Sequence, residues 1–391
     1  MARLDEICLL NMGQSPDSST YNEDGEGMPF FQGNADFGEI NPKIRVWCTE
    51  PTKIANVGDI LISVRAPIGA LNIANTKCCI GRGLAALTVK EDLCAKEYLW
   101  HAIKSKVDEL NSKGTGSTFK AINKNILAET NLPLYSLKEQ KEIANIFDKM
   151  DELISCRKEQ LEKLDELVKA RFVEMFGTFK NNHQRYPVVK IGECAKLQGG
   201  FAFKSSDYLT NGIRLVQISN VNKDTLDWDS INCVPQIFLQ KYKDFELHVG
   251  DLVLAMTRPV IKSLDAVKIA TVSEADVPSL LNQRVGRFVI DRTMLNSVYL
   301  MLCCQMAEFR EYVEAMSGNS LQPNISSKQV EDYCIVLPPI ELQNQFAAFV
   351  EQTEKTKAEV QKSLDELEIL KKSLMQKYFD ANSIVAYLFF L

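Results

Sequence analysis

The chain contains nearly the same sequence twice, and this internal repeat constrains the fold more than any other feature. From Gln140 onward, an offset of 203 residues holds without gaps over about 38 residues and places Phe176 on Phe379. Upstream, Val57-Gly58-Asp59-Ile60-Leu61 returns as Val249-Gly250-Asp251-Leu252-Val253. The repeating unit is roughly 190–200 residues, which is too long for a solenoid and indicates duplication of a whole domain followed by a helix.

Shorter matches extend the repeat through each half. Phe30-Phe31-Gln32 corresponds to Leu215-Val216-Gln217, and we align Gly81-Arg82-Gly83-Leu84 with Gln283-Arg284-Val285-Gly286. Arg258 falls opposite Ala66, one position away from a match with Arg65. The sequence therefore predicts two domains of the same fold in one chain.

Periodicity predicts the elements of each half. Short β-branched and aromatic runs at 60–64, 79–89 and 251–256 are typical of strands, and the segments 95–112 and 294–316 are expected to be helices. Each half then ends in one long helix without an interior Pro or Gly. The predicted fold class is α+β: a tandem duplication of a mixed α/β domain plus a long helix, with the two long helices packed as an antiparallel coiled-coil-like pair.

Apolar residues at steps of three and four define the pairing face of the long helices. Three charged residues, Arg157, Arg171 and Lys357, interrupt this apolar pattern. A helix of about 38 residues spans roughly 57 Å and needs a partner, for which its own repeat is available. A plain dimerisation coiled coil is the alternative. The helix-pairing residues are expected to be Ile143, Phe147, Ile154, Leu161, Leu164, Val168, Phe346, Val350, Leu364, Leu367 and Leu374.

Composition narrows the function. The formal net charge of −6 and a pI near 5.4 argue against a chain that coats nucleic acid through bulk positive charge. Eleven cysteines without a Cys-x-x-Cys pair indicate reduced, buried thiols of a cytoplasmic protein rather than a zinc site. No apolar run reaches the 18 or more residues that a membrane helix needs, so we expect no membrane partner.

Catalytic signatures are few. The sequence has no phosphate-binding Gly-x-x-x-x-Gly-Lys-Ser/Thr loop and no Gly-x-Gly-x-x-Gly after a strand, and its three histidines are widely separated. A nuclease would have to combine Asp17 with Glu139 and Lys141, which are expected in a turn and at a helix start. Recognition remains. Two similar domains held apart by stiff helices suit a partner with a fixed repeat distance, such as a DNA duplex with about 34–36 Å per turn. The alternatives to such a DNA reader are an interaction scaffold of the same build, which binds protein or RNA and reads no bases, and an unrecognised nuclease.

These repeated motifs resemble the specificity subunit of type I restriction–modification enzymes. The resemblance runs from Leu4 to Asp380 and rests on the order, spacing and duplication of individually weak motifs. Those motifs are Val57-Gly58-Asp59-Ile60-Leu61, Ile80-Gly81-Arg82-Gly83, the Leu-Pro elements at 132–133 and 337–338 with Gln140 and Gln343, and the helix ends 174–177 and 376–379. The apolar tail at 381–391 has no match in the first half.

The resemblance implies a non-catalytic, DNA-binding chain. Each half would hold a target recognition domain that reads one half of a bipartite site in double-stranded DNA, and the helices would set the spacing. The chain would dock two methyltransferase subunits, which carry S-adenosylmethionine, and through them restriction (translocase) subunits that use ATP and Mg; it would hold no cofactor or metal itself. The implied boundaries are 1–135 (recognition domain 1), 136–179 (spacer helix 1), 180–187 (linker), 188–338 (recognition domain 2), 339–380 (spacer helix 2) and 381–391 (tail).

Candidate DNA contacts are polar or basic residues that follow predicted strands or lie in polar loops. Arginine reads guanine or clamps phosphate, Asn and Gln suit adenine edges, and glycine lets the backbone approach a phosphate. In the first half the candidates are Gln32, Asn34, Arg65, Arg82, Lys113, Ser117, Thr118 and Lys120. In the second half they are Gln217, Ser219, Asn220, Arg258, Asn282, Gln283, Arg284, Asn319, Ser320 and Gln322.

Overall fold

The structure is a computed structural model, and it describes residues 1–116, 120–178, 182, 186–318 and 322–380. The chain divides into two compact units. Unit 1 consists of Met1–Glu159 together with Gln361–Leu391, and unit 2 of Gln160–Val360. Each unit therefore contains one mixed domain, the beginning of one long helix and the end of the other.

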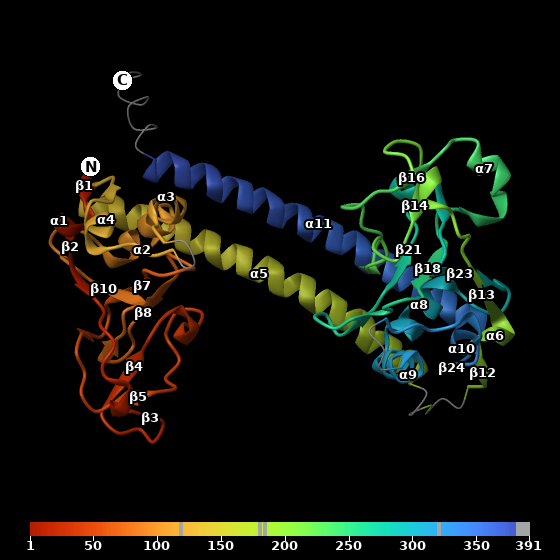
Figure 1. The fold of residues 1–391 in the computed structure, drawn as a ribbon, viewed down its shortest axis with the longest axis horizontal. Coiled ribbons are helices and arrows are strands. Elements are labelled where there is room, and N and C mark those ends of the chain that lie inside the picture. Colours follow the sequence, from red (N-terminus) through yellow and green to blue (C-terminus); the bar gives the residue numbers. More distant parts are fainter. Residues whose placement is uncertain (117–119, 179–181, 183–185, 319–321, 381–391) are drawn as a thin grey trace. The chain divides into compact units, whose positions relative to one another are not determined.

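The domain of unit 1 is built on two small sheets (Figure 1). The first is antiparallel, in the order β2 (Cys8–Met12), β10 (Leu84–Val89), β7 (Ile60–Ser63) and β8 (Leu71–Ile73). The second has the order β3 (Tyr21–Asn22), β5 (Trp47–Cys48), β4 (Met28–Phe31), β9 (Cys78–Ile80) and β6 (Ile54–Ala55), in which β4 and β9 are parallel. β1 (Ala2–Arg3) pairs with β11 (Asn131–Leu132).

Short helices complete this domain and correct two predictions. They are α1 (Leu4–Ile7), α2 (Lys96–Lys104), α3 (Val107–Lys113) and α4 (Lys124–Ala128). The predicted helix 95–112 is thus two helices, because the chain turns at Ser105 and Lys106. The predicted strand 79–89 is also two strands, since the turn at 81–83 carries the chain from the second sheet into the first.

The domain of unit 2 repeats this topology. One sheet has the order β13 (Ala195–Gly199), β23 (Val285–Ile290), β18 (Leu252–Ala255), β21 (Ile269–Thr271) and β15 (Lys223–Asp224). The other has the order β16 (Cys233–Val234), β14 (Ile213–Val216), β22 (Ser279–Leu281) and β17 (Glu246–Leu247), again with a parallel pair, β14 and β22. β12 (Val188–Lys190) pairs with β24 (Cys334–Val336).

The helices of unit 2 also repeat the pattern. They are α6 (Ile191–Cys194), α8 (Ser297–Gln305), α9 (Ala307–Ser317) and α10 (Ser327–Glu331). The predicted helix 294–316 is therefore split at Met306, as its counterpart is in unit 1. Additions in this half are α7 (Phe238–Lys241) and the hairpin of β19 (Val260–Ile261) and β20 (Ala266–Val267). The shared strand orders confirm the predicted tandem duplication.

The structure corrects one aligned position. In unit 1, Leu84 pairs with Ser63, and in unit 2 Val285 pairs with Ala255 at the equivalent place. Val285 is therefore the counterpart of Leu84, which puts Gln283 opposite Arg82. The sequence alignment matched Arg82 with Arg284 because it favoured the identical side chain over the strand register.

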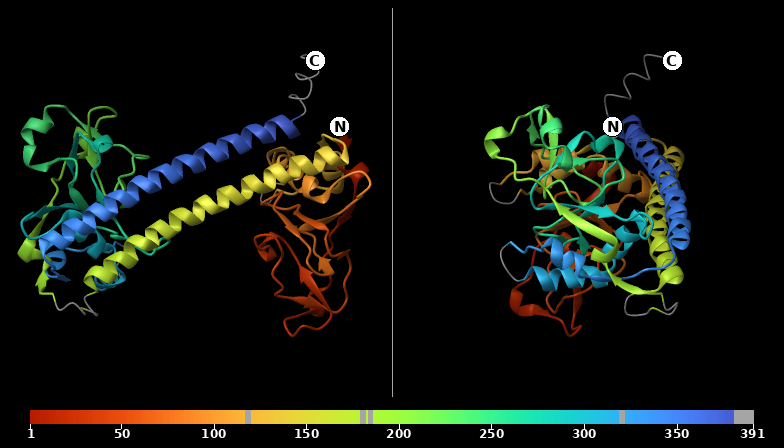
Figure 2. Two further views of the ribbon diagram at one scale, coloured as in Figure 1. Left: turned by 180° about the vertical axis from the view of Figure 1, so that it is seen from behind. Right: turned by 90° about the vertical axis from the view of Figure 1, so that its right-hand side faces the viewer.

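The long helices are α5 (Leu137–Phe176) and α11 (Ile340–Phe379). In unit 1 the ring of Phe147 lies 5.4 Å from that of Phe379, and Lys158 forms an ion pair with Glu368 at 3.2 Å. Residue numbers rise along α5 while those of its partners fall along α11, so the two helices run antiparallel. The left view of Figure 2 shows the start of α5 (yellow) beside the end of α11 (blue) from behind.

Unit 2 shows the same antiparallel pairing at the other ends of the helices. Asp165 forms an ion pair with Lys357 at 2.7 Å, and the rings of Phe176 and Phe346 lie 5.5 Å apart. Lys357, a flaw in the apolar pattern, is therefore accommodated by an acidic partner on the other helix. These contacts confirm the predicted antiparallel pair, described within each unit separately.

The predicted helix-pairing residues all lie on the covered faces of α5 and α11. Ile143, Phe147, Val168, Phe346 and Leu364 are buried, and the other six, Ile154, Leu161, Leu164, Val350, Leu367 and Leu374, are half-buried. Their steps of three and four residues keep one face of each helix turned inward.

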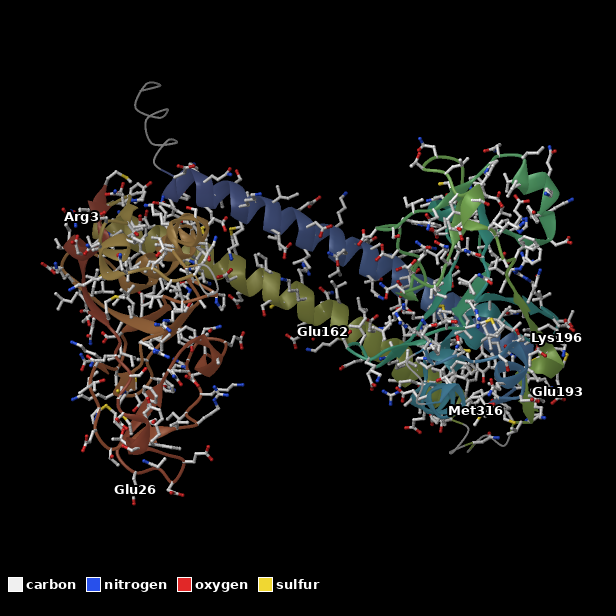
Figure 3. The ribbon with its side chains drawn as sticks, in the orientation of Figure 1. Arg3, Glu26, Glu162, Glu193, Lys196 and Met316 are labelled. Atoms are coloured by element: carbon white, nitrogen blue, oxygen red, sulfur yellow. The ribbon has the colours of Figure 1, made fainter. Side chains whose placement is uncertain are left out.

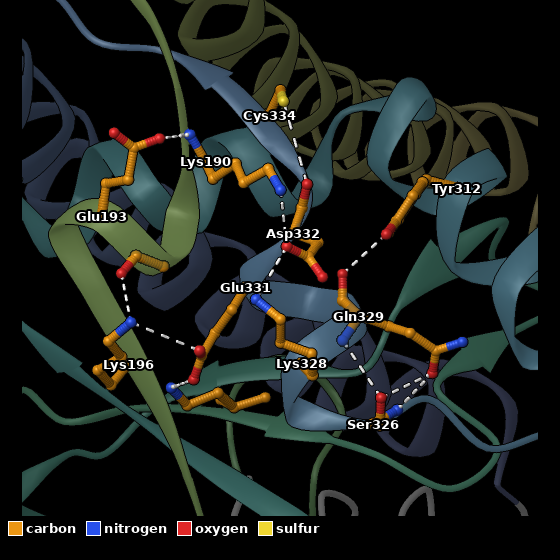
Figure 4. Close-up of polar contacts among 12 residues, drawn as sticks. Lys190, Glu193, Lys196, Tyr312, Ser326, Lys328, Gln329, Glu331, Asp332 and Cys334 are labelled. Carbon is orange, nitrogen blue, oxygen red and sulfur yellow. Dashed lines mark hydrogen bonds and ion pairs between the residues drawn. The ribbon is translucent and has the colours of Figure 1, made fainter.

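A polar network fixes the place where α11 starts in unit 2 (Figure 4). The Glu331 carboxylate accepts a hydrogen bond from the backbone N–H of Leu197 at 3.0 Å. Asp332 accepts hydrogen bonds from Lys190 and Lys328, each at 3.0 Å. These contacts tie α10 to β12 and β13, so the last segment of the domain is anchored to its first strands directly before α11.

The described residues include no helix with both the length and the apolar character needed to cross a membrane. All eleven cysteines are free thiols, and nine are buried.

Candidate nucleic-acid interface

Four segments of the first domain that are far apart in sequence meet at the junction of its two sheets. Backbone hydrogen bonds of 2.8–3.2 Å join them: Gly81 N–H to Phe31 O, Gly83 N–H to Gln32 O, Val64 N–H to Gly83 O, and Ala66 N–H to Lys120 O. Each segment carries predicted DNA contacts. The fold therefore brings together residues that the sequence analysis selected independently.

A hollow lies at this junction. Its lining consists of Gln32, Gly33, Asn34, Ala35, Asp36, Arg45, Arg65, Arg82 and Gly83. Four of these residues, Gln32, Asn34, Arg65 and Arg82, are predicted contacts, and all but the half-buried Asn34 are exposed. With three arginines and one aspartate, the lining is positive in a chain of net charge −6. A positive, open hollow suits phosphate oxygens and the acceptor edges of bases.

Arg45 is a lining residue that the sequence analysis missed. Its Nη2 donates to the Asp36 carboxylate at 2.5 Å and to the carbonyl of Ala35 at 2.8 Å. The same carboxylate accepts backbone hydrogen bonds from Gln32 at 2.7 Å and Gly33 at 3.3 Å. Asp36 thus orders the loop after β4 and holds an arginine beside it.

The glycines of this turn have a role in addition to the one expected. Gly81 and Gly83 are buried, and a Cβ on Gly83 would lie 2.5 Å from the carbonyl oxygen of Gln32. Their lack of a side chain lets two protein segments pack closely. This packing role is additional to the expected approach of the backbone to a phosphate, which stays a prediction.

The second domain assembles its segments in the same way. Backbone hydrogen bonds of 2.7–3.1 Å connect Asn282 N–H to Val216 O, Met256 N–H to Arg284 O, Arg258 N–H to Pro323 O, and Ile325 N–H to Met256 O. Ser219, Arg258, Gln283, Arg284 and Gln322 are exposed around this junction. Five of the predicted contacts are therefore available at the surface.

Lys268 adds a second positive charge next to Arg258 and was also missed from the sequence. Its Nζ donates to the carbonyl of Ile218, in the loop after β14, at 3.3 Å. Burial lowers the pKa of Lys268, and the charge of Arg258 lowers it further. The backbone N–H of Lys268 donates to the carbonyl of Pro259, the residue after Arg258, at 2.7 Å, so the two cations are neighbours at this surface.

Two predicted contacts are buried. Asn220 donates to the carbonyls of Asp227 and Ser230 at 2.9 and 2.7 Å, and its oxygen accepts from the backbone N–H of Gln217 at 3.0 Å. Asn282 accepts from the backbone N–H of Gln283 at 2.8 Å. Their side-chain groups are used inside the protein, so direct base contact does not fit either residue.

Other predicted contacts are partly occupied by protein partners. The half-buried Gln217 accepts from Asn232 at 2.7 Å and donates to the Tyr208 hydroxyl at 3.3 Å. Lys113 pairs with Glu109 at 2.7 Å, whereas Lys120 is exposed. Four predicted contacts, Ser117, Thr118, Asn319 and Ser320, lie outside the described residues.

The residues considered for a nuclease have local structural roles. Asp17 caps a short 3₁₀ turn, where hydrogen bonds from Ser19 lower its pKa. Glu139 accepts from the backbone and hydroxyl of Ser136 at the start of α5, and these hydrogen bonds lower its pKa. In the described part of the chain, no group of three or more His, Cys, Asp or Glu side chains is placed to hold a metal ion.

Two homologous domains with basic junctions, joined through an antiparallel helix pair, define a class of duplicated recognition proteins. The family described as the type I restriction modification DNA specificity domain matches this chain twice, at residues 1–166 and 184–369. The chain belongs to this family.

Individual relatives agree with this assignment. The type I restriction enzyme MjaVIII specificity subunit of Methanocaldococcus jannaschii is 27% identical over 334 residues, 82% of this chain and 78% of the relative. The putative MjaX specificity subunit of that organism is 41% identical over 158 residues, 40% of this chain and 37% of the relative. The crystal structure of a type I restriction–modification S subunit from M. genitalium shares the fold with a TM-score of 0.57 at 16% identity, covering 96% of this chain and 95% of that one.

Proposed function

We propose that this chain is the non-catalytic subunit that gives a type I restriction–modification complex its DNA sequence specificity. Each domain reads one half of a bipartite site in double-stranded DNA, and α5 and α11 set the spacing between the halves. The observation that carries this proposal is the duplicated junction, where the same chain segments meet in both domains and present arginines. Base edges supply the sequence information, and phosphates position the duplex.

We further propose that the long helices dock two methyltransferase subunits, which bring S-adenosylmethionine, and through them restriction subunits that use ATP and Mg. In unit 1, both helices carry exposed apolar side chains: Ile146 and Leu153 on α5, and Ile369 and Leu370 on α11. Apolar side chains exposed on neighbouring helices suit contact with a partner protein. Such a complex acts in the cytoplasm, where the DNA of a prokaryotic cell lies.

The experiment is co-expression of the chain with its methyltransferase subunits in a host without adenine methylation, followed by long-read sequencing of the genome. We expect methylation at one split motif that depends on this chain. An unsplit motif, or methylation that does not need the chain, would contradict the proposal. Binding of RNA or protein without any motif would support the scaffold, and plasmid cleavage by the purified chain with Mg would support a nuclease.

A further inference from the structure

The three arginines around the first hollow are held in two different ways. Arg45 is fixed, because both hydrogen bonds of its Nη2 go to the protein, one to the Asp36 carboxylate and one to the Ala35 carbonyl. Arg65 and Arg82 line the same hollow and are exposed, and no ion pair with another described residue holds either side chain. One arginine therefore has a set orientation and the other two can adjust.

The difference in charge is as important as the difference in mobility. A carboxylate 2.5 Å from Arg45 cancels most of its attraction for a distant phosphate, whereas Arg65 and Arg82 keep theirs. A clamp on a phosphate needs net charge and tolerates a mobile side chain. Reading a neutral base edge needs donors in a fixed direction and little net charge.

On these grounds, and resting on the proposed function, we propose that Arg45 reads a base in the first half-site and that Asp36 positions it. Both N–H groups of Nη2 are occupied by protein, and the Nε–H points to the opposite side from Nη1, so Nη1 is the group of Arg45 left to donate to a base. Guanine presents two adjacent acceptors in the major groove, N7 and O6, so a single donating group finds an acceptor there at either position. Arg65 and Arg82 hold phosphates of the same duplex.

The second domain supports a positioning role for Asp36 by contrast. There the backbone N–H of Gln217, the counterpart of Gln32, is capped by Asn220 at 3.0 Å. Asn220 is neutral, and its amide group donates to backbone carbonyls instead of holding an arginine. Ordering the loop thus needs only a side-chain oxygen. The negative charge in the first domain has the additional task of orienting Arg45.

The first test is the methylation motif of the complete complex carrying Arg45→Ala or Arg45→Lys. We expect one G·C pair in the first half-site to become degenerate, with discrimination lost by about 5- to 150-fold, while the second half-site stays unchanged. Arg45→Lys keeps the positive charge but not the planar group, and should give the same degeneracy. Arg3→Ala is the matched control, because Arg3, labelled in Figure 3, is an exposed arginine paired with Asp5 at 2.8 Å and is not one of the residues that line the hollow.

The second test is the salt dependence of DNA binding by the same complexes. Loss of one phosphate contact lowers the slope of log affinity against log salt by about one, so Arg82→Ala should lower the slope and leave the motif intact. Arg45→Ala should leave the slope unchanged. A lower slope with an intact motif in Arg45→Ala would make Arg45 a phosphate clamp and overturn the assignment, as would no change in either quantity.

Asp36→Asn isolates the positioning role, because it keeps an oxygen for the backbone N–H groups of Gln32 and Gly33 while removing the charge beside Arg45. We expect Asp36→Asn to relax the same base pair, and the double variant with Arg45→Ala to match Arg45→Ala alone. An additional change in the double variant would show that Asp36 acts independently and would overturn its positioning role. A wild-type complex without a split motif would overturn the proposed function, and this assignment with it.

Discussion

Gln140 and Gln343 make the same three hydrogen bonds in the two halves of the chain. The oxygen of Gln140 accepts from Ala95 N–H at 2.8 Å, and its nitrogen donates to the carbonyls of Leu93 and Tyr135 at 3.0 and 2.9 Å. Gln343 forms the equivalent set with Asn296, Met294 and Pro338 at 2.8–3.0 Å. Each glutamine is fully buried and joins the start of a long helix to the short helix of its domain.

This relationship predicts that Gln140→Leu destabilises the protein strongly. The substitution leaves one buried N–H and two carbonyls without partners, each costing about 1–3 kcal/mol, so we expect a loss of at least about 3 kcal/mol in the free energy of unfolding. Chemical denaturation of the purified chain measures it. Gln352→Leu, at an exposed position of α11, is the control and should change stability by less than about 0.5 kcal/mol. Equal effects of the two substitutions would contradict the role of Gln140.

His101 makes the first domain sensitive to acid. It is buried, its Nε2 donates a hydrogen bond to the Asp148 carboxylate at 2.8 Å, and its Nδ1 has no partner among the described residues. Burial lowers the pKa of His101, and the contact with Asp148 offsets only part of this effect. Below the unfolded-state pKa of about 6.5, the unfolded chain binds a proton that the folded chain does not. Stability should therefore fall as the pH drops through this range.

The duplication supplies the variant that tests this prediction, because the counterpart of His101 in α8 is the buried Leu302. We expect the Tm of His101→Leu to rise relative to the Tm of the wild type as the pH is lowered from 7.5 to 5.5. A gain of about 1 kcal/mol corresponds to roughly 2–4 °C. Thermal unfolding at both pH values measures the difference, and a gap that does not change with pH would refute the assignment.

Helix length should determine the unread gap between the half-sites. Because α5 and α11 pair antiparallel, an insertion must be made in both helices, and seven residues preserve the three-and-four spacing of the seam. Seven residues after Leu161 and seven after Gln361 add about 10 Å of helix, equivalent to roughly three base pairs. We expect the methylation motif to keep both halves and gain about three unread positions.

An insertion in α5 alone is the control for this prediction. It misaligns the seam and should lower the thermal stability of the chain without giving a defined longer motif. If the double insertion leaves the gap at its original length, the helices do not set the spacing.

The acidic balance of the chain predicts that it binds DNA weakly by itself. With a net charge of −6, it neutralises few phosphates beyond the basic junctions of its two domains, so the methyltransferase partners should supply much of the phosphate contact. At 150 mM salt we expect the isolated chain to bind its site at least about tenfold more weakly than the assembled complex. Fluorescence anisotropy with a labelled duplex compares the affinities of the isolated chain and the assembled complex. Equal affinities would contradict the prediction that the partners supply much of the phosphate contact.

The repeat made most of the fold predictable, because an offset shared over many residues identifies equivalent elements without knowledge of their contacts. The breaks within the predicted helices were not predictable. The chain turns at Ser105 and at Met306 without Pro or Gly, since tertiary packing, not local propensity, ends those helices. The parallel pairing of β4 with β9 joins segments about 50 residues apart and leaves no local pattern.

The candidate site was predictable where residue type and exposure coincide, as for Arg65 and Arg82. It was not predictable where a polar side chain serves the fold. Asparagine is typical of surface loops, yet the amide groups of Asn220 and Asn282 are buried and form hydrogen bonds within turns of the protein. Arg45 escaped notice because its significance lies in a contact with Asp36 across a loop, which no spacing rule indicates.

Exchange of one reading domain tests the central claim most directly. Residues 1–135 would be replaced by those of a family member that retains the aromatic packing around Phe147 and Phe379, and the methylome of the resulting complex would be sequenced. Our account predicts that one half of the split motif changes while the other half and the gap stay as they were. A motif that changes in both halves, or in neither, would contradict it.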